Sequence, residues 1–213
     1  MATISIRQLV KPTSEELDAA GAVVASAMED DAFTAGCVGG DKKFVFPFHR
    51  ATCAAAAIGG QLWVASCGET DIAGVAAWFG PGQALLYSPE QGEAGYNDLF
   101  QAFSPGLTKW WMEYFLPKYE EQTTKALGER VKLGAWHLQL FAVLPELQGK
   151  GLGSALVRPV LEKAAAERKP ICLETEAAKN LPIYEHWGLV VKSEERYESS
   201  TGGFPMWVMY KQV

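Results

Sequence analysis

The chain has 213 residues, 48% of them hydrophobic, and carries a formal net charge of −6 at pH 7. This length suits one domain, or at most two small ones, and the hydrophobic share is enough for a substantial core, which argues against disorder. The acidic balance argues against a nucleic-acid partner, because such binding needs a basic face that releases counterions from phosphates.

The cysteines and the N-terminus exclude further classes of protein. Four cysteines are scattered along the chain without a Cys-x-x-Cys pair. We therefore expect buried free thiols, with neither a zinc site nor a disulfide framework. No stretch approaches the roughly 20 apolar residues that span a bilayer, and the first residues lack the pattern of a signal peptide. The sequence predicts a soluble cytoplasmic protein without a membrane partner.

The first part of the chain predicts a strand, two helices and a hairpin. The strand follows from alternating apolar and polar residues, and the helices follow from apolar residues at helical spacing after capping residues. The expected elements are strand Thr3–Leu9, helix Pro12–Asp30, loop Asp31–Gly40, helix Asp41–Ile58 with Pro47 as a candidate break, and hairpin strands Gln61–Cys67 and Ile72–Phe79.

The segment from Glu93 to Leu127 is rich in aromatic residues at spacings of three and four, which predicts two helices packed on a sheet. Ser104-Pro105-Gly106 and Pro117 are expected to interrupt them. We interpret these rings mainly as core packing and expect one or two of them to reach a substrate pocket.

The last part of the chain alternates strands and helices. A proline inside the first of these helices, Pro159, predicts a kink or a locally opened turn. The expected elements are strand Trp136–Val143, helix Gly151–Arg168, strand Ile171–Thr175, helix Ala178–Trp187, a strand that begins at Leu189–Lys192, and strand Pro205–Lys211.

Three glycines, Gly149, Gly151 and Gly153, follow the strand Trp136–Val143 and precede a helix. Glycines let successive backbone N–H groups converge on one anion, and a helix start adds partial positive charge, so a phosphate is expected here. The spacing excludes both the Walker loop and the dinucleotide fingerprint. It fits the pattern Gln-x-x-Gly-x-Gly, which begins here at Gln148.

This pattern is the acyl-CoA signature of the GNAT N-acetyltransferases, and the chain resembles that family. From Val143 to Val191 it is similar to puromycin N-acetyltransferase and its relatives. The matching positions are Gln148–Ala155, Pro159, Leu173-Glu174-Thr175, Asn180-Leu181-Pro182, Tyr184-Glu185 and Gly188. The resemblance implies one α/β domain over residues 1–213, with a mixed central sheet of six to seven strands, flanked by helices and splayed between its fourth and fifth strands.

The resemblance also has departures. His137 and Gln139 stand on the strand where the antibiotic-modifying enzyme has apolar residues, and Trp187-Gly188-Leu189 replaces the usual apolar-Gly-Phe. The identity of the substrate is therefore not carried over.

The resemblance implies acetyl-CoA as co-substrate and no metal. The strand backbone from Phe141 to Val143 would pair with the pantetheine arm, and N–H groups of the loop would hold the pyrophosphate. Lys150 would add a point charge or remain solvated, and Asn180 would orient the pantetheine arm or cap its own helix. The cofactor-binding candidates are Phe141, Ala142, Val143, Gln148, Gly149, Lys150, Gly151, Leu152, Gly153, Ser154, Asn180 and Tyr184.

Acetyl transfer to an amine requires a base, an oxyanion stabiliser and an acid for the departing thiolate. A backbone N–H at a strand bulge near Phe141–Val143 is the candidate for the oxyanion. Tyr184 is the candidate acid, and its structural alternative is a ring packed at a helix end.

Glu174 and His137 are alternative bases. Glu174 lies on the strand beside the cofactor and matches a glutamate implicated in the puromycin enzyme. The strand period predicts that His137 shares a face with Gln139, Phe141 and Val143, and arylalkylamine acetyltransferases carry a histidine at the corresponding place. A histidine that is merely satisfied in the core is the structural alternative.

The leading hypothesis is an enzyme, an acetyl-CoA-dependent N-acetyltransferase that moves an acetyl group directly to a primary amine of a small molecule, as a monomer or homodimer. One alternative is a catalytically silent acyl-CoA-binding sensor module. Another is a peptide or protein N-acetyltransferase.

Overall fold

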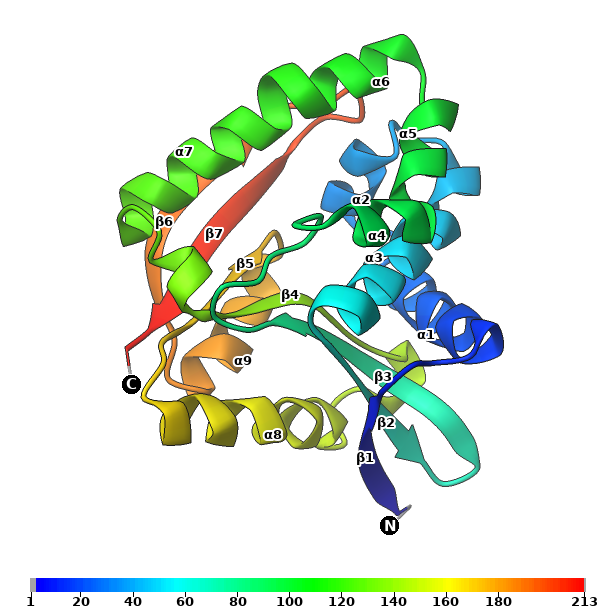
Figure 1. Ribbon diagram of the computed structural model, residues 1–213, viewed down its shortest axis with the longest axis vertical. Helices are drawn as coiled ribbons and strands as arrows, with labels where there is room; N and C mark the ends of the chain where they lie inside the picture. The colour runs from blue at the N-terminus through cyan, green and yellow to red at the C-terminus, as the bar shows by residue number, and fades with distance from the viewer. Residues whose placement is uncertain (1–2, 213) are drawn as a thin grey trace.

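The computed structural model describes residues 3–212. A seven-stranded sheet runs through the molecule in the order β1-β2-β3-β4-β5-β7-β6 (Figure 1). Neighbouring strands pair antiparallel except β4 and β5, which are parallel. The strands are β1 (Ile4–Leu9), β2 (Gln61–Cys67), β3 (Thr70–Phe79), β4 (Trp136–Val143), β5 (Ile171–Thr175), β6 (Val190–Tyr197) and β7 (Phe204–Lys211). The mixed α/β class and the strand number agree with the sequence prediction.

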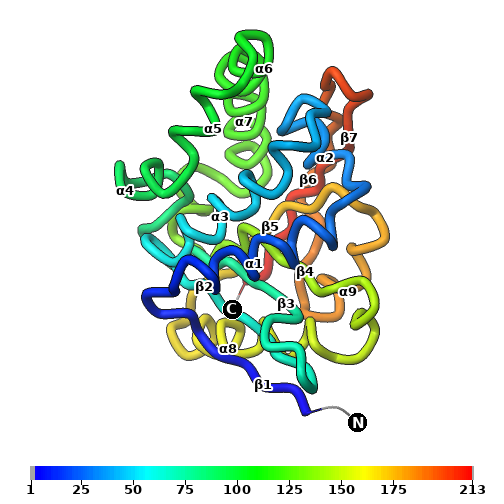
Figure 2. The backbone as a smooth tube through the Cα atoms, turned by 90° about the vertical axis from the view of Figure 1, so that its right-hand side faces the viewer, coloured from blue at the N-terminus to red at the C-terminus, as the bar shows by residue number. Residues whose placement is uncertain are grey.

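Helices cover both faces of this sheet. The helices α8 and α9 lie at one end of the molecule, and α6 lies at the other (Figures 1 and 2). The α-helices are α1 (Ser14–Ala27), α2 (Ala32–Cys37), α3 (Val45–Gly59), α4 (Pro89–Gln91), α5 (Asn97–Ala102), α6 (Pro105–Trp110), α7 (Leu116–Leu127), α8 (Leu152–Glu167) and α9 (Leu181–His186).

Hydrophobic clusters on the two faces fix where these helices pack. One cluster joins β4 and β5 to α8 and α9 through residues such as Leu138, Leu156 and Tyr184. A second cluster joins the opposite face of β2, β3 and β4 to α1 and α3, with Val24 and Leu140 among its members. Burial of these side chains, at about 25 cal/mol per Å² of apolar surface, is the main source of the sheet's stability.

The aromatic segment forms a third core cluster, as predicted. It packs around Trp111 and Phe115 and reaches Tyr197 and Phe204 on β6 and β7. The helix α7 lies along these two strands (Figure 1). Tyr119, a partly buried member of this cluster, is the ring that leads to the candidate site described below.

The segment Asp31–Gly40 was predicted as a loop, and this prediction is wrong. It contains α2, which begins after Asp31, whose carboxylate accepts a 2.7 Å hydrogen bond from the N–H of Thr34. A helix of six residues is too short to show a hydrophobic period, so the side-chain cap was its only local signal.

Two prolines predicted as breaks do not interrupt their helices. Pro47 lies in the first turn of α3, where a backbone N–H needs no helical acceptor. Pro117 is the second residue of α7 and lies within a continuous helical run. A π-helical turn, Trp111–Phe115, joins α6 to α7 without a gap. Pro159 lies within α8, which extends through it to Glu167, and the kink or opened turn expected there stays a prediction. The predicted interruption at Ser104-Pro105 is present.

The four cysteines are buried free thiols, as expected. Within residues 3–212 no group of three or more His, Cys, Asp or Glu side chains is arranged to hold a metal ion. In the same part of the chain, no helix is long and apolar enough to cross a membrane.

Candidate functional site

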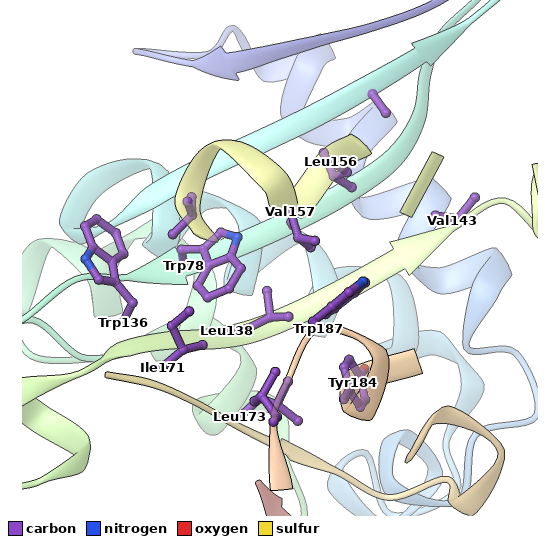
Figure 3. Close-up of a cluster of buried hydrophobic side chains, with 14 of the residues drawn as sticks. Trp78, Trp136, Leu138, Val143, Leu156, Val157, Ile171, Leu173, Tyr184 and Trp187 are labelled. Atoms are coloured by element: carbon purple, nitrogen blue, oxygen red, sulfur yellow. The ribbon is translucent and has the colours of Figure 1, made fainter. Parts of the chain in front are cut away.

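The parallel strands β4 and β5 pair over only three residues. The pairs are Trp136 with Ile171, His137 with Cys172, and Leu138 with Leu173. Beyond Leu138, β4 continues to Val143 while it remains paired with β3, so its edge toward β5 is left free. Figure 3 shows Trp187 and Tyr184 beside this part of β4. The sheet is therefore splayed between its fourth and fifth strands, as predicted.

A bulge in β4 lies at the point where the two strands separate. Trp78 of β3 is opposite Leu138, but its neighbour Ala77 is opposite Leu140. Two adjacent residues of β3 thus face residues of β4 that are two apart, and Gln139 is the extra residue. The bulge predicted near Phe141–Val143 lies instead at Gln139.

The bulge also reverses which residues share a face of β4. Leu138, before the bulge, packs on the α8 side, whereas Leu140 and Ala142, after it, pack on the α1 and α3 side. Phe141 and Val143 therefore face α8, and His137 faces the opposite way. The prediction that His137 shares a face with Phe141 and Val143 is wrong, because an extra residue shifts the two-residue period.

His137 and Glu174 meet on the face of the sheet opposite α8. The imidazole Nε2 of His137 lies 2.7 Å from Oε2 of Glu174, and their side chains keep only 5% and 7% of their surface exposed. The two candidate bases thus form one hydrogen-bonded pair.

Two residues that the sequence analysis did not name complete this cluster. The hydroxyl of Tyr119, on α7, donates a 2.7 Å hydrogen bond to Oε2 of Glu174. The ammonium of Lys132, in a 3-10 turn just before β4, lies 3.0 Å from Oε1 of Glu174 and also contacts the Tyr119 hydroxyl. One or two rings of the aromatic segment were expected to reach the site, but Tyr119 was not singled out among them. No sequence pattern indicated Lys132.

The charges of the cluster determine which protonation states it holds. Burial raises the pKa of the Glu174 carboxyl, but Lys132 and His137 outweigh burial and bring that pKa well below its usual range. Burial and the positive charge of Lys132 lower the pKa of His137, against the opposing effect of Glu174. At neutral pH the pair is therefore an ionised carboxylate and a neutral imidazole.

These states assign the tautomer of His137. An ionised carboxylate only accepts hydrogen bonds, so Nε2 must carry the proton and donate it to Glu174. Nδ1 then has a free lone pair, and it forms no hydrogen bond with any described residue. It is not among the fully buried side-chain atoms that lack a partner, so it retains accessible surface. A group placed beside Nδ1 could give it a proton.

Tyr184 lies on α9, within the cluster on the α8 side of the sheet, and is 6% exposed. Its ring centroid is 5.4 Å from that of Trp187, which in turn packs at 5.4 Å against Phe141. Burial raises the pKa of Tyr184, so its hydroxyl stays protonated. Trp187 Nε1 is buried and has no hydrogen-bond partner among the described residues.

The glycine loop has the open backbone that an anion site needs. Gly149 and Gly151 adopt φ values of 72° and 85°, which favour glycine, and a Cβ on either would meet nothing within 4 Å. Among backbone bonds of the described residues, the N–H of Ala155 is the first in α8 with an acceptor, the carbonyl of Gly151. The N–H groups from Gly149 to Ser154 are thus free for a ligand.

Two contacts tie this loop to β4. Gln148 donates a 3.0 Å hydrogen bond from Nε2 to the carbonyl of Val143. A Cβ on Gly153 would lie 2.8 Å from Cζ of Phe141, so any larger residue there requires the Phe141 ring to shift. Lys150 donates to the carbonyl of Glu146 at 2.9 Å, and Asn180 makes no side-chain cap on α9. The capping alternative for Asn180 is therefore wrong.

Comparisons with known proteins agree on one family. A model of the GNAT acetyltransferase domain matches residues 112–209. An uncharacterised N-acetyltransferase of Schizosaccharomyces pombe is 27% identical over 155 residues, which are 67% of this chain and 57% of that protein. The chain thus spans little more than half the length of this relative.

Solved structures share the fold at low sequence identity. A structure described as a histone acetyltransferase and related acetyltransferase from Corynebacterium glutamicum is 19% identical, with a TM-score of 0.62 over 99% of this chain and 96% of that one. A polyamine N-acetyltransferase of Drosophila melanogaster, which forms N-acetylagmatine, is 13% identical, with a TM-score of 0.60 over 99% and 100%. At these identities the likeness concerns the fold alone.

Proposed function

Because the chain belongs to the GNAT acetyltransferase superfamily, we propose that it is an acetyl-CoA-dependent N-acetyltransferase acting on a primary amine of a small molecule. The observation that carries this proposal is the position of three groups around the splayed strands. His137, paired with Glu174, lies on one face of the sheet, and Tyr184 lies on the other. Such an arrangement provides a base and an acid on opposite sides of one gap.

The residues around the gap fit acetyl-CoA. The free edge of β4 from Phe141 to Val143 offers backbone groups to an extended pantetheine arm, with Ala142 between them. The unpaired N–H groups from Gly149 to Ser154, including those of Lys150 and Leu152, suit the pyrophosphate. When bound, the cofactor would supply the activated acetyl group. Asn180, at the start of α9, remains a candidate for orienting the pantetheine arm.

In this proposal His137 is the base and Glu174 orients it. The amine reaches the cleft mainly as an ammonium ion and must lose a proton before or during attack. Nδ1 of His137 takes up that proton, and the ionised Glu174 stabilises the resulting imidazolium through Nε2. Glu174 is a weaker candidate for the base, because its carboxylate already accepts hydrogen bonds from Tyr119, Lys132 and His137.

Two further groups would serve the acyl transfer. The bulge at Gln139 removes a residue from the ladder with β3, so a backbone N–H at this point could stabilise the oxyanion, at about 3 kcal/mol. Tyr184 would donate its proton to the departing thiolate. Because burial raises the pKa of Tyr184 above its ordinary value, it matches a thiol near 8.5 only modestly, and the transfer depends on close contact.

Release of CoA thiol from acetyl-CoA, measured across polyamines, arylalkylamines, amino acids, amine drugs and peptides, tests this function. We expect release with at least one small amine and little with peptides. Release with peptides alone would favour the protein-acetylating alternative. Tight acetyl-CoA binding without release for any amine would favour the sensor module and overturn the proposal.

A further inference from the structure

We propose that Lys132 and Tyr119 are positioning residues of this site, which hold Glu174 as an ionised acceptor and leave Nδ1 of His137 free to take a proton. This inference rests on the proposed function. Neither residue belongs to β4, β5 or the glycine loop, and each reaches the site from the segment between β3 and β4.

The carboxylate of Glu174 accepts hydrogen bonds from three donors. Oε1 accepts from Lys132 at 3.0 Å, while Oε2 accepts from Tyr119 and from His137, both at 2.7 Å. The ammonium also lies 4.1 Å from the centre of the Tyr119 ring, a cation–π distance. The carboxylate is thereby fixed in one orientation, and so is the imidazole that donates to it.

Charge balance explains why the positive charge of Lys132 matters. The buried cluster contains one cation, Lys132, and one anion, Glu174, with His137 and Tyr119 neutral. The side chain of Lys132 is 24% exposed, so it links the buried pair to solvent. Without that charge, a buried carboxylate beside an imidazole would be compensated by a proton from solvent.

Other ionisable groups lie near the cluster and affect the pKa values of Tyr119 and Glu176. Cys172 and Glu176 both act on Tyr119, and burial is the main reason that the pKa of Tyr119 lies well above its usual value. Burial also raises the pKa of Glu176 well above its usual range, with Asp31 and Glu174 adding to that effect. The charged groups that act on the pKa of His137 are Lys132, which lowers it, and Glu174, which raises it.

The proton step that these residues support is balanced within the site. An N–H bond of the substrate ammonium breaks, its electron pair stays on the nitrogen of the amine that then attacks, and the proton forms a new bond to Nδ1. His137 becomes an imidazolium that donates from Nε2 to Glu174. If Lys132 were absent, a larger share of the pair would already hold a proton before the amine arrived, and less free base would remain.

The test is the titration of His137 in the free protein, followed by NMR of ¹⁵N-labelled imidazole. Lys132→Gln should raise the midpoint of the His137 titration by about one pH unit or more. At a pH below both midpoints, the share of His137 that is unprotonated should then be about ten-fold lower than in the wild type. Lys132→Arg keeps the charge and should restore the original midpoint within about 0.3 of a pH unit. The matched control is Lys118→Gln, because Lys118 contacts Glu195 and the carbonyl of Arg196, away from the cluster.

A second pair of variants tests Tyr119. Tyr119→Phe removes the hydroxyl donor to Glu174 and should raise the His137 midpoint by a smaller amount, because a hydrogen bond to the charged carboxylate is lost. Tyr114→Phe is the matched control, since the Tyr114 hydroxyl accepts from the N–H of Glu198 instead.

An unchanged His137 midpoint in a folded Lys132→Gln variant would overturn the inference. A fall in thermal stability with no change in midpoint would mean that Lys132 has a structural role only, and would also overturn it. Folding is checked by acetyl-CoA binding measured calorimetrically. Because the titration needs neither an amine nor turnover, it separates failure of this inference from failure of the proposed function.

Discussion

His137 and Glu174 share a 2.7 Å hydrogen bond at the last point where β4 and β5 still run together. His137 is opposite Cys172, two residues before Glu174, and the ladder ends at the next pair. The pair therefore lies at the apex of the splayed strands, where a ligand in the gap would present its reacting end. This position makes the division of roles between the two side chains testable.

His137→Ala should lower kcat about 100-fold or more, the scale of losing a positioned base. Glu174→Gln should lower kcat less, about ten-fold, because the imidazole remains while its anionic partner is lost. The measurement is kcat between pH 5 and 9 with the best amine of the panel. A Glu174→Gln variant as inactive as His137→Ala, or more so, would instead identify Glu174 as the base.

Tyr184→Phe should lower turnover about ten-fold or more while acetyl-CoA still binds, because only the proton for the thiolate is removed. The control is Tyr210→Phe, whose hydroxyl contacts Gln212 near the end of the chain. Steady-state kinetics and calorimetric titration with acetyl-CoA check the two halves of this prediction. Unchanged turnover would remove Tyr184 from the acid role and leave it as core packing.

Gly153→Ala should destabilise the protein by about 1–3 kcal/mol and weaken acetyl-CoA binding, since the new methyl group would lie 2.8 Å from Cζ of Phe141. Gly106→Ala, in α6, meets nothing within 4 Å and serves as the control. Urea unfolding and the acetyl-CoA affinity are measured for both. Equal stability and affinity of Gly153→Ala and the wild type would show that Phe141 moves freely.

His49 should make the fold sensitive to acid. It is buried on α3, where Thr34 lies 3.4 Å from Nε2, and its Nδ1 has no partner among the described residues. Burial lowers its pKa to about 4 in the folded protein, against about 6.5 when unfolded. The unfolded chain therefore binds more protons between these values, and stability should fall as pH drops from about 6.5 to about 4.

The loss attributable to His49 over that range is about 3 kcal/mol at most. Urea unfolding at pH 7 and pH 4.5 measures it, and His49→Gln should reduce the difference between the two pH values. His186→Gln, which changes an exposed histidine on α9, should leave the difference as it is. An equal pH effect in the wild type and His49→Gln would contradict the prediction.

The sequence by itself determined those features that depend only on residues adjacent along the chain, namely strand bounds and loop conformation. Strand Ile171–Thr175 has the predicted bounds, and Gly149 and Gly151 adopt the left-handed conformations that the loop motif requires. The glycines predict a phosphate site, because they are needed wherever a backbone must approach a phosphate, whereas the splayed sheet was expected only from the resemblance to the GNAT family.

Only the tertiary structure decided how the reacting groups meet. The extra residue at Gln139 turned His137 away from Phe141, because pairing with β3, and not the local period, sets the face of each side chain. Tyr119 and Lys132 reach Glu174 across 55 and 42 residues of chain. Such contacts arise because α7 and the turn before β4 pack against the sheet, and the spacing of residues along the sequence does not indicate them.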